Sequence, residues 1–343
     1  MRFTKKSLII AGILFILAFL ASTYKLPYYV NKPGLADDLT DIVQVEDGHS
    51  SKGSLHLVTI SSGQATPINY IAATLLPHQD IVPMQEARNG MSDELYMQHQ
   101  MFMMENSQHA AMVVAYEAAG KEIEIVPDGV HVIQVEEGLP AEGKVKPGDK
   151  ITAIDGEKIK DAESLTDYVN EKQKGDVIDL DIERDGETLE EEVDIVPLEN
   201  EDKVGIGIRL VTDETIEAEP EMSFDSGKIG GPSAGLMFSL EVYNQLTEED
   251  ITNGSNIVGT GEIDRDGNVL PIGGIDKKVV AADKEGADIF FAPHEGGKQD
   301  SNYEVAKETA ENIHSEMDVV PVDSFEDALD YLTERETTTK AAS

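Results

Sequence analysis

TGEIDRDGNVLPIGGIDKKVVAADKEGA, residues 260–287, is the stretch that constrains the fold most closely. The spacing of its apolar residues and the turn residues Asp266-Gly267 predict two short strands joined by a tight turn. From about residue 275 the apolar spacing changes to that of a helix. The segment therefore predicts a strand, a turn, a second strand and an amphipathic helix in direct succession.

Two adjacent lysines on this predicted helix, Lys277 and Lys278, lie at different angles from its apolar face. Ile275, Val279 and Ala282 share one apolar face. At about 100° per residue, Lys278 lies about 60° from this stripe and Lys277 about 160° from it. We therefore expect Lys277 to point into water and Lys278 to lean towards the core. A lysine at an apolar boundary loses hydration, so its pKa falls and its neutral amine can accept a proton.

Ser233 is the candidate partner for such a base. GGPSAG, residues 230–235, contains the pattern G-x-S-x-G, which often carries a nucleophilic serine. A polar, glycine-bearing segment precedes it and a predicted helix follows it. Ser233 is therefore expected at a helix start, where unpaired backbone N–H groups favour negative charge. An ordinary N-cap serine is the structural alternative, and His294 in the predicted loop FAPHEGG is the alternative base.

These two stretches, in this order, resemble the proteolytic domain of Lon proteases, which use a Ser-Lys dyad. The resemblance implies that Ser233 is the nucleophile, Lys278 the general base and Thr260 the threonine that orients the lysine. It extends more loosely over residues 200–335. It further implies an oxyanion loop whose backbone comes from Gly231, Pro232 and Ala234.

Two departures from the Lon pattern limit what is carried over. The acidic residue that often precedes the GPSAG glycine is replaced by Gly230, so an acid at that position is not expected to act. No ATPase module is found, so ATP-driven unfolding of substrates is not expected. GLPAEGK at 138–144 fits the start of a phosphate-binding loop, but neither Ser nor Thr follows it to hold magnesium. We therefore expect no ATP binding.

Residues 126–198 resemble a PDZ domain of the type found in bacterial proteases. The resemblance rests on the start GVHV, on the small-residue turn LPA at 139–141 and on KPGDKITAIDGEKI at 146–159. Such domains bind an extended peptide as an added strand. By this resemblance the peptide groove is expected between one strand and one helix, although the same apolar residues would equally form a core. The expected groove residues are Val130, His131, Val132, Leu165 and Val169.

The N-terminal segment predicts a membrane anchor. Basic residues precede residues 7–24, a stretch without charge that is just long enough to cross a bilayer. Basic residues before a span favour an N-terminus in the cytoplasm, which would leave everything after residue 25 outside. A cleaved signal peptide is the alternative. It is disfavoured by the length of the apolar stretch and the lack of a clear cleavage site.

Composition narrows the classes of partner. The formal net charge of −40 argues against a nucleic-acid partner, since few cations could neutralise phosphates. The acidic residues are spread along the chain, as expected for a heavily hydrated surface adapted to salt. The absence of cysteine excludes disulfides and thiolate metal sites. We expect no metal and no cofactor.

The predicted fold class is α+β: a Lon-type proteolytic domain with an inserted PDZ domain, preceded by one transmembrane helix. This arrangement resembles the family of membrane-anchored, ATP-independent PDZ–Lon proteases. The implied partners are membrane-associated or extracytoplasmic protein substrates and the lipid bilayer. A catalytically inactive PDZ scaffold and an esterase using His294 stay open as alternatives, as does a homo-oligomer. The expected divisions are 1–6 cytoplasmic, 7–24 anchor, 25–52 linker, 53–125 first Lon-like part, 126–198 PDZ domain, 199–335 Lon-like catalytic domain and 336–343 disordered tail.

Overall fold

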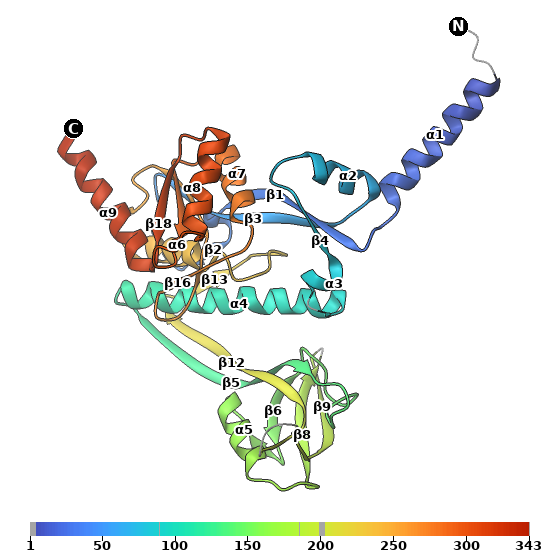
Figure 1. Cartoon of the computed structure of the whole chain (residues 1–343). Helices are drawn as coiled ribbons and strands as arrows, with labels where there is room; N and C mark the ends of the chain where they lie inside the picture. Colours follow the sequence, from blue (N-terminus) through green and yellow to red (C-terminus); the bar gives the residue numbers. More distant parts are fainter. Residues whose placement is uncertain (1–4, 89, 185, 199–202, 343) are drawn as a thin grey trace. The chain divides into compact units, whose positions relative to one another are not determined.

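The computed structural model describes residues 5–88, 90–184, 186–198 and 203–342. The chain forms two compact units (Figure 1). The first, here called the split unit, combines Met1–Lys121 with Pro220–Ser343, and the second, the inserted unit, comprises Glu122–Glu219. The chain thus leaves the split unit once, forms the inserted unit and returns. The inserted unit is longer than the predicted segment 126–198, because its first and last strands extend beyond that segment at both ends.

The split unit is built on a mixed six-stranded sheet with the order β18-β17-β14-β3-β1-β4. The strands β3, β14, β17 and β18 run parallel, whereas β1 is antiparallel to both β3 and β4. The strands are β1 (Tyr28–Asp38), β3 (Ser54–Gln64), β4 (Asp80–Pro83), β14 (Asn256–Gly259), β17 (Ile289–Pro293) and β18 (Asp318–Val322).

Two helix pairs pack against this sheet. Helix α6 is buried around most of its circumference and packs on α4, as expected for a helix with apolar residues on nearly every face. Helix α7 packs on α8 over a core that includes Val58, Val258 and Phe290 from neighbouring strands. The helix predicted from about residue 275 is confirmed. The helices are α4 (Asp93–Ala118), α6 (Gly235–Leu246), α7 (Ile275–Glu285), α8 (Asn302–Ile313) and α9 (Phe325–Ala342).

Smaller elements complete the split unit. The strands β15 and β16 pair antiparallel around the turn at Asp266-Gly267, as predicted. Strand β2 pairs with β13, which leads into the Ser233 loop. The remaining elements are α1 (Lys5–Thr23), the 3-10 helix η1 (Leu39–Asp41), β2 (Val43–Val45), α2 (Pro67–Leu75), α3 (Met84–Ala87), β13 (Met222–Phe224), β15 (Glu262–Ile263) and β16 (Val269–Leu270).

The predicted linker at 25–52 is wrong for much of its length, because it contains a strand in the middle of the sheet. Strand β1 is bonded to β3 on one side and to β4 on the other. Pro33 and Gly34 interrupt its pattern and coincide with a register shift against β3. A Cβ on Gly34 would lie 2.5 Å from the carbonyl oxygen of Thr59. Glycine is therefore required there, although in the sequence it looks like a loop residue.

The C-terminal end of the chain differs from the predicted disordered tail, and the predicted membrane anchor at the N-terminal end stays a prediction. Helix α9 continues to Ala342, so the predicted tail at 336–343 is helical up to that residue, and Ser343 lies outside the described residues. The apolar stretch at 7–24 is largely contained in α1. Among the described residues, no helix meets both the length and the apolarity needed to cross a membrane.

The inserted unit is a second sheet with the order β12-β5-β6-β8-β9, in which β7 pairs with β6. Its apolar core lies between this sheet and α5, which begins at a capping box formed by Asp161 and Ser164. The elements are β5 (Glu122–Val135), β6 (Lys150–Ile154), β7 (Glu157–Lys158), α5 (Ala162–Asn170), β8 (Val177–Arg184), β9 (Glu187–Asp194), β10 (Val196–Pro197), β11 (Val204–Gly205) and β12 (Ile208–Glu219).

Candidate active site

Ser233 lies in the loop between β13 and α6. The N-cap of α6 is Ala234, and no side chain caps this helix. Ser233 is therefore not an N-cap serine, and its hydroxyl is not used to begin the helix. Gly231 has φ +90°, a conformation that favours glycine, and a Cβ there would meet the side chain of Gln100. This turn presents the Ser233 side chain to a cleft.

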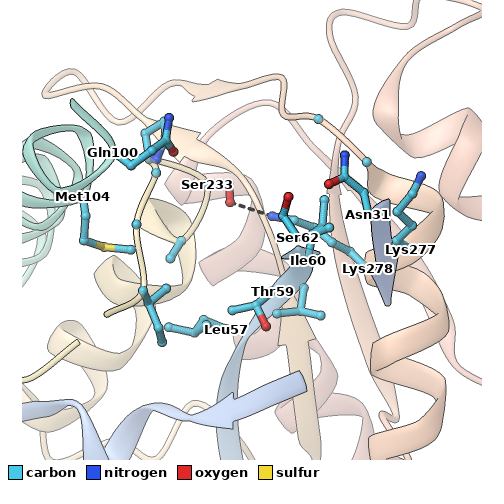
Figure 2. Close-up of a pocket in the computed structure, with 18 of the residues that line it drawn as sticks. Asn31, Leu57, Thr59, Ile60, Ser62, Gln100, Met104, Ser233, Lys277 and Lys278 are labelled. Carbon is cyan, nitrogen blue, oxygen red and sulfur yellow. Dashed lines mark hydrogen bonds between the residues drawn. The ribbon is translucent and has the colours of Figure 1, made fainter. Parts of the chain in front are cut away.

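The structure brings together the three predicted side chains Ser233, Lys278 and Thr260. The Lys278 Nζ atom lies 2.6 Å from Ser233 Oγ (Figure 2). It also lies 2.8 Å from Thr260 Oγ1. The Thr260 hydroxyl in turn donates to the backbone carbonyl of Ser233 at 2.9 Å. Thr260 thus contacts both the amine and the backbone of the serine, and it fixes their relative positions.

Lys278 is held in surroundings that disfavour its charge. Its exposed fraction is 3%, and no carboxylate pairs with it in the part of the chain that the structure describes. It lies in the first turn of α7, where the helix dipole also disfavours a cation. Burial lowers the pKa of Lys278 to about 7. A substantial fraction of this amine is therefore neutral near neutral pH and able to accept a proton.

The backbone around Ser233 offers two N–H groups for a developing negative charge. The amide of Gly231 already donates to the carbonyl of Gln100 at 2.8 Å, and Pro232 has no N–H. The amides of Ser233 and Ala234 have no hydrogen-bond partner within the described ranges. Of the predicted oxyanion loop, this leaves Ala234, together with Ser233 itself, as the available donors.

Helix α4 holds the serine loop in place, a role that the sequence did not indicate. The buried Ser107 hydroxyl donates to the carbonyl of Pro232 at 2.9 Å, directly before Ser233. The Gln108 amide donates to the Ser226 hydroxyl at 3.1 Å. In the sequence Ser107 stands between Asn106 and Gln108, in a polar stretch that indicates no partner for its hydroxyl.

The prediction that Lys277 points into water is wrong. Its exposed fraction is 2%, and its Nζ forms ion pairs with Asp80 and with Asp276, the latter at 3.0 Å. Helical phase correctly separates Lys277 from Lys278. It does not reveal that β4 brings a carboxylate to the far side of the helix. Lys277 is therefore buried but has anionic partners, whereas Lys278 is buried among hydroxyls.

A cleft of about 850 Å³ opens in front of Ser233. Both lysines line it at one end, and Gln100 and Met104 of α4 line the other (Figure 2). Its walls are mostly uncharged and combine apolar side chains with hydroxyls. They include Leu57, Thr59, Ile60 and Ser62 of β3, Asn31 of β1, and Tyr96 and Met97 of α4.

His294, the alternative base, is not among the residues that line this cleft. Its Nδ1 lies 3.0 Å from a carboxylate oxygen of Asp323. The Ser233 hydroxyl instead has the amine of Lys278 as its partner. The structure therefore does not assemble the serine–histidine pair that the esterase alternative requires.

The predicted peptide groove is wrong in its position. Residues Val130 to Val132 lie in β5, which is paired with β12 on one side and with β6 on the other. A peptide cannot add to a strand whose two edges are occupied. His131 is half-buried, and its Nε2 atom lies 3.5 Å from Oδ1 of Asp213. The apolar groove candidates are all core residues with exposed fractions of 6% or less: Val130, Val132, Leu165 and Val169.

Comparison with known proteins identifies two domains in the chain. Residues 225–335 match the Lon protease (S16) C-terminal proteolytic domain, and residues 101–195 match the PDZ domain. The Lon protease of Campylobacter jejuni is 32% identical over 101 residues, which cover 29% of this chain and 12% of the relative. The Lon protease of Chloroflexus aggregans is 33% identical over 98 residues, which cover 29% and 11%. The chain thus spans only about an eighth of the length of these relatives.

Among solved structures, the PDZ domain of an SdrC-like protein from Listeria monocytogenes is 31% identical. The match covers 24% of this chain and 88% of that one, with a TM-score of 0.24. The residues Ser233, Thr260 and Lys278 all fall within the stretch matched to the Lon proteolytic domain. The chain therefore combines a stretch that matches a PDZ domain with a stretch that matches a Lon-type proteolytic domain.

Proposed function

We propose that this protein is a serine endopeptidase with a Ser-Lys dyad. The observation that carries the proposal is the distance of 2.6 Å between Lys278 Nζ and Ser233 Oγ. The lysine is buried, and no carboxylate among the described residues pairs with it. A lysine in these surroundings can act as a general base without a histidine or an aspartate. The match to the Lon proteolytic domain gives peptide bonds as the substrate class.

The mechanism follows from the contacts. Neutral Lys278 takes the hydroxyl proton as Ser233 Oγ attacks the peptide carbonyl carbon, and the amides of Ser233 and Ala234 stabilise the oxyanion. The Lys278 ammonium then gives its proton to the leaving amine as the C–N bond breaks. Lys278 next takes a proton from a water molecule, whose oxygen attacks the carbonyl carbon of the acyl-enzyme. As the ester bond breaks, Lys278 returns this proton to Ser233 Oγ, and the acid is released. The Thr260 hydroxyl holds the Lys278 amine towards Ser233 Oγ throughout these steps.

The test is peptide cleavage by the purified full chain and by Ser233→Ala. We expect cleavage of an unfolded protein or a fluorogenic peptide by the wild type without added ATP, and none by the variant. A fluorophosphonate probe should label Ser233 in the wild type only. If a well-folded wild type shows neither labelling nor cleavage, the inactive scaffold becomes the better account of this chain.

We further propose that residues 7–24 anchor the protein in a membrane, with the two units outside the cytoplasm. The support is the charge pattern of the sequence, in which an uncharged stretch follows Arg2, Lys5 and Lys6. Membrane fractions washed with alkaline carbonate should retain the full chain, and external protease should digest both units in intact cells. A chain found only in the soluble fraction would contradict the anchor. Comparison of membrane proteomes with the wild type and with Ser233→Ala would then identify substrates as the proteins that accumulate.

We also propose that the inserted unit presents substrates along the free edge of β12. Strand β12 ends the order of this sheet, and α5 lies against it, with the Ala162 amide donating to Thr212 Oγ1 at 3.0 Å. An edge strand beside a helix can accept an extended peptide as a further strand. Half-buried Leu210 on β12 packs against the core from this edge.

Leu210→Lys tests this presentation. It should weaken cleavage of the native target but leave cleavage of a generic unfolded peptide unchanged. Val177→Lys, at an exposed apolar position on β8, is the matched control and should change neither activity. Equal loss against both substrates after Leu210→Lys, in a folded protein, would contradict a presenting role.

A further inference from the structure

One exposed part of this acidic protein carries no charge. Residues 53–79 contain no Asp, Glu, Lys or Arg, although 27% of the chain is charged. The first part of this segment is the buried strand β3, but the second part is α2, at the surface. Four large apolar side chains there have exposed fractions between 47% and 77%. They are Ile68, Ile71, Leu75 and Leu76.

The inner side of α2 is fixed against the sheet. Ala73 is buried in a small apolar cluster with Val30, and half-buried Tyr70 stacks edge-on against Tyr28 at 5.3 Å between ring centroids. Thr66 caps the helix through the Asn69 amide. At about 100° per residue, Ile68, Ile71 and Leu75 fall within about 60° of one another and away from Ala73. These three side chains therefore form a fixed, outward apolar face, called here the α2 face.

The α2 face starts close to the end of α1. The amide of Leu26 donates to the carbonyl of Ala65, and the amide of Ala65 donates to the carbonyl of Tyr28, each at 2.8 Å. Leu26 is three positions after Thr23, the last residue of α1, and three residues span at most about 10 Å. Helix α1 also contacts α2 directly (Figure 1). Any surface on which α1 ends must therefore lie within reach of α2.

We propose that α2 is an interfacial membrane helix whose apolar face enters the headgroup region of the bilayer that holds α1. The proposal rests on the membrane anchoring proposed above and adds to it a second, shallow contact. An apolar face of this kind binds a bilayer by burial of a shallow layer of side chains. Acidic surface would be repelled by anionic lipid headgroups, whereas the uncharged segment around α2 is not. Two contacts, one through α1 and one through α2, limit how the split unit can tilt over the membrane.

The chain contains no tryptophan, so a single introduced indole reports its own surroundings. The probe is Leu75→Trp in the full chain, reconstituted in phosphatidylcholine vesicles whose acyl chains carry bromine, which quenches indole fluorescence. The bromine is placed either near the headgroups (shallow) or near the bilayer centre (deep). We expect shallow bromine to remove much more of its emission than deep bromine. Ile71→Trp is the second variant and should behave in the same way. Val305→Trp is the control, at an exposed position of α8 at the opposite end of the sheet. Its fluorescence should be unchanged in both kinds of brominated vesicle.

A fourth variant separates this inference from the anchor. Phe15→Trp, on exposed α1, should be quenched by deep bromine if α1 inserts. Quenching of Phe15→Trp without quenching of Leu75→Trp and Ile71→Trp would overturn the interfacial role of α2 but leave the anchor intact. Loss of quenching in all variants would overturn both. An emission change in the α2 variants that depends on protein concentration, and not on bromine, would assign the α2 face to a second copy of the chain and overturn the proposal.

Discussion

The two lysines at the start of α7 are adjacent, equally buried and differently surrounded. Lys277 meets the carboxylates of Asp80 and Asp276, whereas Lys278 meets the hydroxyls of Ser233 and Thr260. Carboxylate partners favour the charged ammonium, and hydroxyl partners without a counter-charge do not. Burial alone therefore does not make a lysine a base. The partners decide whether the buried amine keeps its proton.

Removal of Lys278 is expected to have the largest effect on activity. Lys278→Ala should reduce peptide cleavage by on the order of a thousandfold or more, as Ser233→Ala should, because the pair acts as a unit. The double variant should then be no worse than either single variant. Cleavage rates of all three, with folding matched by circular dichroism, measure this. An active Lys278→Ala variant would contradict the assignment of Lys278, and not Lys277, as the general base.

Removal of the Lys278 amine should stabilise the folded state. The pKa of Lys278 in the folded protein, about 7, lies below the ordinary lysine value of 10.5, so the unfolded chain binds more protons between these two values. This lysine therefore destabilises the folded state near neutral pH, and stability rises as pH increases towards the unfolded pKa. Lys278→Met should unfold at a higher temperature than wild type, and the gain should shrink in more alkaline buffer. A gain that does not change with pH would contradict a buried neutral amine.

Ser107 tests whether the serine side of the dyad must be held in place. Ser107→Ala removes the hydrogen bond to Pro232, and small displacements of a reacting group cost roughly tenfold to a hundredfold in rate. We expect kcat to fall with KM nearly unchanged. The control is Ser239→Ala, because the hydroxyl of this buried serine donates to the carbonyl of Gly235 within its own helix. Equal effects of the two variants on kcat would reduce Ser107 to a packing residue.

Lys277→Met should have the smallest effect on activity. It leaves Asp80 and Asp276 without their shared cation, but both carboxylates reach solvent, so the expected stability loss is only roughly 1 kcal/mol. Cleavage rates should stay within severalfold of wild type. Thermal unfolding and peptide cleavage measure the two effects separately. A loss of activity as large as that of Lys278→Ala would assign the base to the wrong lysine.

The sequence predicted best where function requires particular residue types in a fixed order. The serine loop and the helix with two lysines carry such patterns, and the structure brings Ser233, Thr260 and Lys278 within hydrogen-bond distance of one another. Helical phase correctly placed the two lysines on different sides of the helix, although Lys277 is buried and does not point into water. The partners of the two lysines did not follow from helical phase, because Asp80 comes from a strand far away in the sequence.

Strand pairing was the part that the sequence could not supply. The apolar alternation at Val130 and Val132 correctly indicated a strand with buried side chains, but it could not show which edges are occupied. That depends on β12, which the predicted segment 126–198 left out. Strand β1 was missed because Pro33 and Gly34 resemble a loop, although Gly34 is required there by the close approach of β3.

The pH dependence of kcat/KM for a small peptide tests the central claim most directly. Only the neutral amine of Lys278 can take the serine proton, so activity should rise through a single ionisation near pH 7 and stay high on the alkaline side. Lys277→Met should show the same profile, because the Lys277 amine pairs with Asp80 and Asp276, whereas the Lys278 amine contacts the Ser233 hydroxyl. A rate that is flat across this range, or an ionisation that disappears in Lys277→Met, would contradict Lys278 as the base.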